Sequence, residues 1–128
     1  MKKVSKRTLK NLSGVNSKLA LIVGMVLARG KVDLTVISGL RTAQKQNKIF
    51  LDGRSQLDGY NKISYHQTGN AIDFIPYPFV INDWRDVNRF VLIGQELKLA
   101  AKHLGFNYSY GGDWKTFKDY GHFELHEK

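Results

Sequence analysis

Residues 64–75 of the chain are SYHQTGNAIDFI, and this stretch decides both the fold and the site that the sequence predicts. Its second half is short and mostly apolar and is followed by two prolines, which predicts a strand over residues 71–75. His66 lies in the loop before this strand, and Asp73 projects from the strand seven residues later. Because Gly69 permits a tight turn between them, the imidazole and the carboxylate can face one pocket.

The chain on either side of this strand alternates between predicted helices and predicted strands. Apolar periodicity and capping residues predict helices over residues 5–14, 16–29, 42–51 and 84–104. Short β-branched or aromatic runs predict further strands over residues 33–38, 106–110 and 122–125. This order of elements predicts an α+β fold in which a small antiparallel or mixed sheet packs against helices on one side, with a metal site at the sheet.

Length and composition limit the class of protein. The 128 residues fit one compact domain, and no repeat, low-complexity tract or linker marks a boundary within residues 1–128. An apolar fraction of 42% with 12% aromatic residues is typical of a folded protein rather than a disordered one. With 0 Cys, the chain contains neither disulfides nor thiolate ligands, so any transition metal must be bound by histidines and carboxylates.

The formal net charge of +9 is concentrated in the amino-terminal half. Residues 1–62 contain 13 Lys and Arg against 3 Asp and Glu, whereas residues 63–128 contain 7 against 8. Such a surface favours a polyanionic partner, which charge alone leaves open as nucleic acid, a membrane surface or anionic wall polymers. Since no recognised nucleic-acid motif accompanies the charge, we do not expect nucleic acid to be the partner.

The apolar run over residues 19–28 follows a lysine-rich start, and this pattern resembles that of a signal peptide. It has about half of the ~20 residues that a membrane-spanning helix needs. Leu12 and Val15 extend its apolar pattern toward the amino terminus with helical spacing. We therefore predict a buried helix and no transmembrane segment.

A third metal ligand is predicted near the carboxyl end of the chain. In the predicted strand 122–125, His122 and Glu124 share one face while the two apolar residues share the other, because side chains alternate along a strand. His66, Asp73 and His122 would then bind one zinc ion and leave a fourth position for water, as in catalytic zinc sites.

Catalysis at such a site also needs a base and a group that stabilises the developing oxyanion. Asp119, three residues before His122, is the nearest candidate base, and Glu124 is the reserve candidate. Arg41, at a predicted strand-to-helix junction, is suited to bind the oxygen of the attacked carbonyl. A structural alternative stays open for Asp73, which is an ion pair with Arg41.

Other polar and aromatic residues allow structural interpretations as well. Asp113 and Asp119 could be turn residues, and Trp114 could belong to the core. His103, on a predicted helix, and His126, in the tail, are expected to have ordinary structural roles.

Four motifs in the chain follow one another in an order that resembles a known superfamily. They are Ser-Gly-Leu-Arg-Thr at 38–42 with Gln46 downstream, Ser-x-His-x-x-Gly-x-Ala-x-Asp at 64–73, Gly-Gly-Asp-Trp at 111–114 and Asp-x-Gly-His-Phe-Glu at 119–124. The set resembles the D-alanyl-D-alanine carboxypeptidase and L-alanyl-D-glutamate peptidase superfamily of VanY-like zinc peptidases. The match covers roughly residues 30–125.

The resemblance implies particular roles for residues that match the motifs. It implies that His66, Asp73 and His122 bind zinc, that Asp119 is the base and that Arg41 stabilises the transition state. It further implies that Ser64 and Gln46 contact the substrate peptide. Asp113 is an alternative candidate for orienting a metal ligand.

The short length and the Asp-x-Gly-His-Phe form most resemble phage endolysins that cleave the L-Ala-D-Glu bond of peptidoglycan stems, which leads to bacterial lysis. Carboxypeptidase members often have Glu-Trp before the final ligand region, and this chain does not. The alternatives are a D-alanyl-D-alanine carboxypeptidase of the same fold and a non-enzymatic, basic polyanion-binding module. As an endolysin, the chain would be a monomer that stays in the host cytoplasm before lysis and then binds the wall through its cationic surface.

Overall fold

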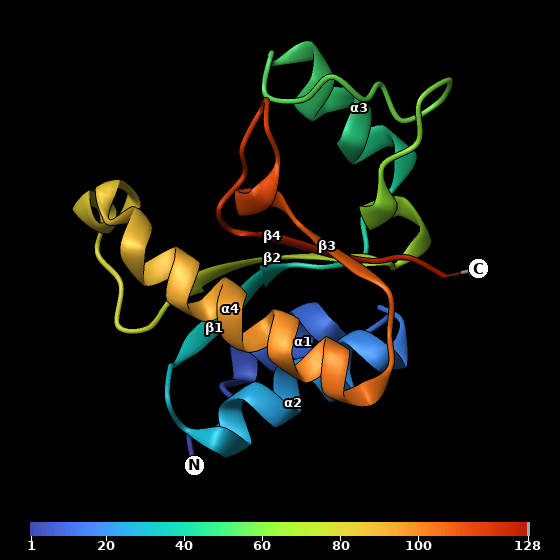
Figure 1. Cartoon of the computed structure of the whole chain (residues 1–128). Helices are drawn as coiled ribbons and strands as arrows, with labels where there is room; N and C mark the ends of the chain where they lie inside the picture. The colour runs from blue at the N-terminus through green and yellow to red at the C-terminus, as the bar shows by residue number, and fades with distance from the viewer. Residues whose placement is uncertain (128) are drawn as a thin grey trace.

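A four-stranded antiparallel sheet forms the centre of the molecule in a computed structural model that describes residues 1–127 (Figure 1). Lys128, the last residue of the predicted domain, lies outside the described residues. The strands, in the order in which they neighbour one another, are β1 (Leu34–Ser38), β2 (Ala71–Pro76), β4 (His122–Leu125) and β3 (Tyr108–Tyr110). The predicted α+β class is confirmed, and the sheet is antiparallel rather than mixed.

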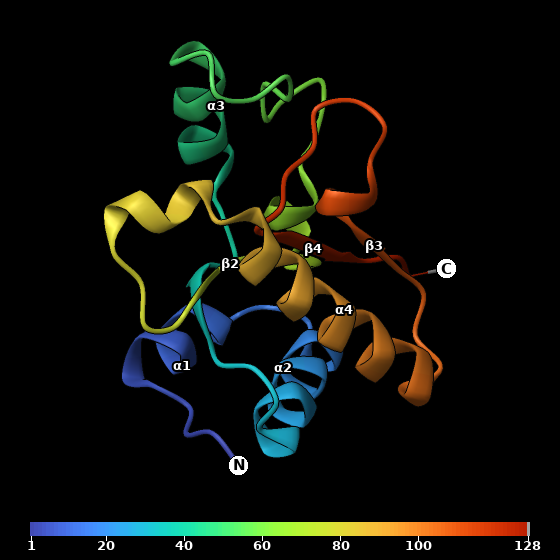
Figure 2. The same cartoon turned by 60° about the vertical axis from the view of Figure 1, so that its left-hand side comes forward.

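Helices cover one face of this sheet. They are α1 (Lys6–Leu12), α2 (Ser17–Arg29) and α4 (Val87–Leu104), which lie together below the sheet in Figure 1. Helix α3 (Ala43–Leu51) lies beyond the opposite face, so the prediction of helices on one side is wrong for this element (Figures 1 and 2). Helices α2 and α4 pack against each other, and Figure 2 shows them side by side.

Helix α2 is the buried helix that the apolar run predicts. Its inward face contributes five side chains to the core, which are Leu19, Ile22, Val23, Val26 and Leu27. The helix is capped at its start by Asn16, whose side chain accepts the amide N–H of Lys18, and at its end by Gly30 in the left-handed conformation. No helix within residues 1–127 has both the length and the apolar character needed to cross a membrane.

Two predicted boundaries are wrong for local reasons. The helix predicted from residue 84 begins at Val87, because a short 3-10 helix (Ile81–Arg85) precedes it and Asp86 leaves helical geometry with ψ of 73°. The loop predicted before the strand at residues 71–75 contains a 3-10 helix, η1 (Tyr65–Thr68). Its side-chain capping contacts are not encoded in hydrophobic periodicity, the signal from which helices are predicted.

The register of the sheet brings polar residues from three strands into one row. Asp73 on β2 is paired with Ser38 on β1 and with His122 on β4. Directly paired residues present their side chains on the same face of a sheet. On β4 the alternate residues Phe123 and Leu125 are buried in the core, as predicted. The face that the core does not use therefore carries the candidate site.

Two glycines in helices make a matched test of the packing between α4 and the sheet. A Cβ at Gly94 would clash with the ring of Tyr110, whereas a Cβ at Gly24 would meet nothing within 4 Å. We predict that Gly94→Ala lowers the free energy of unfolding by about 1–3 kcal/mol through overpacking. Gly24→Ala should raise it by up to about 1 kcal/mol, because alanine favours the helix. Urea denaturation measures both, and equal effects would contradict this packing.

Candidate metal centre

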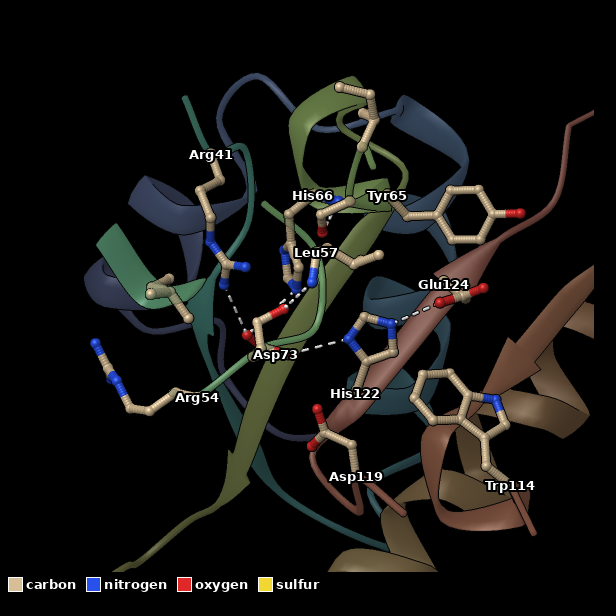
Figure 3. A pocket seen from close by; sticks show the side chains of 14 residues that line it. Arg41, Arg54, Leu57, Tyr65, His66, Asp73, Trp114, Asp119, His122 and Glu124 are labelled. Carbon is tan, nitrogen blue, oxygen red and sulfur yellow. Dashed lines mark hydrogen bonds and ion pairs between the residues drawn. The ribbon is translucent and has the colours of Figure 1, made fainter. Parts of the chain in front are cut away.

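Two imidazoles and one carboxylate from distant parts of the chain meet above the middle of the sheet (Figure 3). The Nε2 atom of His66 lies 3.3 Å from Oδ2 of Asp73, and the Nδ1 atom of His122 lies 3.2 Å from Oδ1 of the same carboxylate. One ligand atom from each of the three residues lies within 4.8 Å of the others. The structure thus brings together the three residues that the sequence predicts as ligands, in an arrangement that could hold a metal ion.

The local backbone and one hydrogen bond fix the orientation of His66. Ser64 caps η1 by accepting the amide N–H of His66, and Gly69 ends η1 with φ of 76°. The Nδ1 atom of His66 lies 2.8 Å from the carbonyl oxygen of Gly39, which can only accept a proton. His66 therefore donates through Nδ1, and its Nε2 faces the cluster as the nitrogen that could bind a metal ion.

A carboxylate beyond the cluster orients the second imidazole. The Nε2 atom of His122 lies 2.7 Å from Oε1 of Glu124, and the other oxygen of Glu124 lies 2.7 Å from Nε2 of His126. The side chain of Glu124 is buried, so this pairing is shielded from water. A carboxylate that accepts the distal N–H of an imidazole is the usual support of a metal-binding histidine. His126, which is expected from the sequence to have an ordinary structural role, thus contacts the carboxylate that orients His122.

The cluster shifts the pKa values of its own members. Burial raises the pKa of Asp73, but hydrogen bonds from His122 and His66 and their nearby charges outweigh burial and hold it well below its usual range. Burial lowers the pKa of His122, but hydrogen bonds to Asp73 and Glu124 outweigh it and raise the value to about 9. Asp73 and His122 are therefore oppositely charged partners at neutral pH.

Arg41 reaches the same carboxylate from the loop after β1. Its Nη2 donates to Oδ2 of Asp73 at 3.3 Å and to the hydroxyl of Ser38 at 3.2 Å, while Nη1 donates to Gln46 at 2.8 Å. Within residues 1–127, its Nε is the buried side-chain nitrogen that has no hydrogen-bond partner. The ion pair that the sequence left as an alternative for Asp73 is thus present, and it coexists with the two histidine contacts.

Asp119 lies in the turn that leads into β4, at the mouth of the cleft beside the cluster (Figure 3). Its backbone is held by hydrogen bonds from its amide to Gly111 and from the amide of His122 to its carbonyl, at 3.0 and 3.2 Å. Partial desolvation by the cleft walls raises the pKa of its carboxyl group, and the negative charge of Asp73 raises it further. An accessible carboxylate with a raised pKa is suited to accept a proton near neutral pH.

The predicted substrate contacts lie in two different environments. Ser64 lines the cleft. Gln46 is 1% exposed, and its side chain bonds Arg41, the hydroxyl of Ser55 and the carbonyl of Leu57. The structure therefore places Gln46 behind Arg41 rather than on the cleft surface.

Two further sequence interpretations are corrected. Asp113, a candidate for orienting a metal ligand, is exposed and forms an ion pair with Lys98 at 2.9 Å. Trp114, which could belong to the core by residue type, lines the cleft instead, where its ring centre lies 5.3 Å from that of His122. Its indole N–H donates to Ser109 at 2.8 Å, which fixes the ring in the cleft wall.

The cleft over the cluster has a volume of about 450 Å³ and combines apolar walls with charged groups. Several of its lining residues were not predicted from the sequence, and these are Ile49, Arg54, Leu57, Ile63 and Tyr65. All come from α3 or from the chain between α3 and β2, where no periodic pattern marks an exposed site. Only the three-dimensional path of this segment shows that it forms a wall of the cleft.

Comparison with known proteins identifies the family. A family model described as phage L-alanyl-D-glutamate peptidase matches residues 1–126. The chain belongs to this family. The resemblance inferred from four short motifs is therefore confirmed over nearly the full length.

Relatives within this family come from phages and from bacteria. The L-alanyl-D-glutamate peptidase of Escherichia phage T5 is 33% identical over 118 residues, which cover 92% of this chain and 85% of that protein. The peptidoglycan L-alanyl-D-glutamate endopeptidase CwlK of Bacillus subtilis is 31% identical over 114 residues, covering 73% of this chain and 61% of that protein.

Solved structures support the same fold. The L-Ala D-Glu endopeptidase ChiX of Serratia marcescens superposes with a TM-score of 0.84 at 30% identity, covering 98% of this chain and 90% of that one. The vancomycin-resistance D,D-pentapeptidase VanY superposes with a TM-score of 0.60 at 15% identity, covering 87% of this chain and 72% of that one. At 15% identity, the similarity to VanY shows a shared fold alone.

The raised pKa of His122 predicts how the stability of chelator-treated protein depends on pH. Because the pKa is about 9 in the fold and ordinarily 6.5, the stabilisation is complete below pH 6.5 and is lost as the pH rises through 9. We predict a fall of roughly 3 kcal/mol in the free energy of unfolding across this window. Urea denaturation of protein in excess chelator measures it, and a constant or rising stability would contradict the charged cluster.

Proposed function

We propose that the chain is a zinc-dependent peptidoglycan endopeptidase that hydrolyses the L-Ala-D-Glu bond of stem peptides. The observation that carries the proposal is the convergence of His66, Asp73 and His122 at the floor of an open cleft, in a chain of the phage L-alanyl-D-glutamate peptidase family. The names of the phage T5 peptidase, CwlK and ChiX describe enzymes that cleave this bond. We assign the whole of residues 1–128 to this one catalytic domain.

The donor set suits zinc. Two imidazole nitrogens and a carboxylate oxygen are ligands that zinc accepts in catalytic sites, and the chain has 0 Cys to compete for it. The hydrogen bond from His66 to Gly39 and the hydrogen bond from His122 to Glu124 orient the ligand nitrogens toward Asp73. Bound zinc would supply a Lewis acid that polarises the scissile carbonyl and lowers the pKa of a coordinated water.

Asp119 and Arg41 would act on the reacting peptide from two sides of the cleft. Asp119 would take the proton from the attacking water and deliver it to the amide nitrogen that leaves. Arg41, held by Gln46 and Ser38, would bind the carbonyl oxygen as negative charge develops on it. Glu124 is occupied by His122 and His126, which makes it an orienting group and favours Asp119 as the base.

The surroundings of the site suit an enzyme of bacterial lysis. With a net charge of +9, the chain would be held near anionic wall polymers. We further propose that it acts as a monomer on the cell wall after accumulating in the host cytoplasm. Ser64, on the cleft wall, would contact the stem peptide.

Digestion of purified peptidoglycan tests the proposed bond. We predict that zinc-loaded protein releases fragments with new amino-terminal D-glutamate, detected by end-group labelling and mass spectrometry. Asp73→Ala should lose both the bound zinc and the digestion, because it removes the carboxylate between the two imidazoles. Release of free D-alanine instead would identify a D-alanyl-D-alanine carboxypeptidase, and wall binding without any product would identify a binding module.

A second prediction separates the base from the ligands. Asp119→Ala should retain zinc and lose turnover by at least about 100-fold, because the base is absent while the three ligands are intact. Asp113→Ala is the matched control, since it removes an exposed carboxylate that pairs with Lys98 and should leave the rate unchanged. Zinc content by elemental analysis and the rate of wall digestion are the two measurements. A near-normal rate for Asp119→Ala would assign the proton transfer to another group.

A further inference from the structure

The segment between α3 and η1 forms one wall of the cleft and carries an arginine, Arg54, that the mechanism above does not use. Gly53, in the left-handed conformation with φ of 77°, turns the chain at the end of α3. The amide of Arg54 then donates to the carbonyl of Ile49 at 3.0 Å. Ile49, Arg54 and Leu57 all line the cleft. The wall thus combines one cation with apolar side chains.

This wall is fixed by side chains from α3 and η1. Gln46 donates to the hydroxyl of Ser55 at 3.1 Å and to the carbonyl of Leu57 at 2.9 Å. Gln67 donates to the carbonyl of Gly59 at 2.8 Å. Because Gln46 also binds Arg41, the wall that carries Arg54 is tied directly to the catalytic arginine. The segment is therefore built to hold a defined position beside the reacting peptide.

The guanidinium of Arg54 is available to a ligand. Its one ion pair, among the described residues, is with Asp52 at 3.4 Å, and the two side chains are 66% and 47% exposed. Exposed pairs of this kind contribute little free energy and are easily exchanged. The other arginine of the cleft, Arg41, is 12% exposed and already bonded to Asp73, Ser38 and Gln46. Arg41 and Arg54 line the same cleft.

The proposed substrate carries an anion beside the bond that is cut. In stem peptides D-glutamate continues the chain through its γ-carboxyl group, so its α-carboxyl group lies next to the amide that joins it to L-alanine. In some walls this α-carboxyl group is free, and in others it is amidated to D-isoglutamine. Of the two arginines that line the cleft, Arg41 is already bonded to Asp73, Ser38 and Gln46, which leaves the exposed guanidinium of Arg54 to pair with a free carboxylate.

We propose that Arg54 is a specificity-determining residue that binds the free α-carboxylate of D-glutamate and makes the enzyme prefer unamidated stems. The inference rests on the proposed function and names the part of the substrate that the α3–η1 wall recognises. A guanidinium can make two parallel hydrogen bonds to a carboxylate, whereas a neutral carboxamide offers one acceptor oxygen and loses the charge. The discrimination therefore arises in binding rather than in the chemistry at the cluster.

The experiment compares two synthetic stem peptides that differ only in that group, one with D-glutamate and one with D-isoglutamine. For zinc-loaded wild-type protein we expect kcat/KM to be about tenfold higher for the D-glutamate peptide. Arg54→Gln should bring the ratio close to one, through a higher KM for the D-glutamate peptide and with kcat nearly unchanged. Arg54→Lys should keep part of the preference, because it retains the charge without the planar fork.

Lys48→Gln is the matched control. It removes one positive charge from an exposed position on α3, outside the cleft lining, and should leave the ratio of the two peptides as it is in the wild type. Equal thermal unfolding temperatures for the three variants and the wild type check that the fold is retained. A long-range effect of net charge would instead change the ratio equally in Lys48→Gln and Arg54→Gln, and that result would overturn the proposal.

Different results would overturn the role of Arg54 and the endopeptidase function. Cleavage of both peptides by the wild type with the same kcat/KM, or an unchanged preference in Arg54→Gln, would overturn the role of Arg54 and leave the endopeptidase assignment intact. Cleavage of neither peptide by zinc-loaded wild type would refute the proposed function, and the role of Arg54 with it.

Discussion

The carboxylate of Asp73 is the interaction on which the site depends. It is fixed in the middle of β2, and its two oxygens are met by His66, His122 and Arg41 at 3.2 to 3.3 Å. A carboxylate in a partly buried position on an apolar strand is costly unless such partners surround it. The same requirement fixes the register of the sheet, because β1 and β4 must place polar residues beside it. The rest of the fold can be understood as the support of this charge cluster, with an apolar core beneath the sheet and a cleft above it.

The sequence predicts the part of this arrangement that follows from periodicity. Strand alternation in residues 122–125 places His122 and Glu124 away from the core, and the structure agrees. The apolar run that forms α2 is also predicted from the sequence, because its capping residues and its length both fit a buried helix. The four motifs add the family, since their order is far more specific than any one of them. What these signals share is that each is local in the chain or repeats at a fixed spacing.

The parts that sequence could not predict depend on contacts between segments. The position of α3 beyond the sheet is set by tertiary contacts that leave no periodic signal. Gln46 matches a motif, yet it is buried behind Arg41, a distinction that only the packing of α3 reveals. Trp114 is typical of a core residue by type, yet it stands in the cleft wall, where a bond to Ser109 holds it. The contact of His126 with Glu124 depends on the orientation of the Glu124 carboxylate. That orientation is known only from the three-dimensional positions of β4 and the residues after it.

A single zinc ion is expected at one location with defined ligand atoms. The most direct measurement is anomalous X-ray scattering at the zinc edge from crystals of the zinc-loaded protein. The result that supports the account is one strong peak in contact with Nε2 of His66, a carboxylate oxygen of Asp73 and Nδ1 of His122, about 2.0 to 2.2 Å from each. A peak at any other group of residues, or histidines that turn away from Asp73 in the presence of zinc, would contradict it.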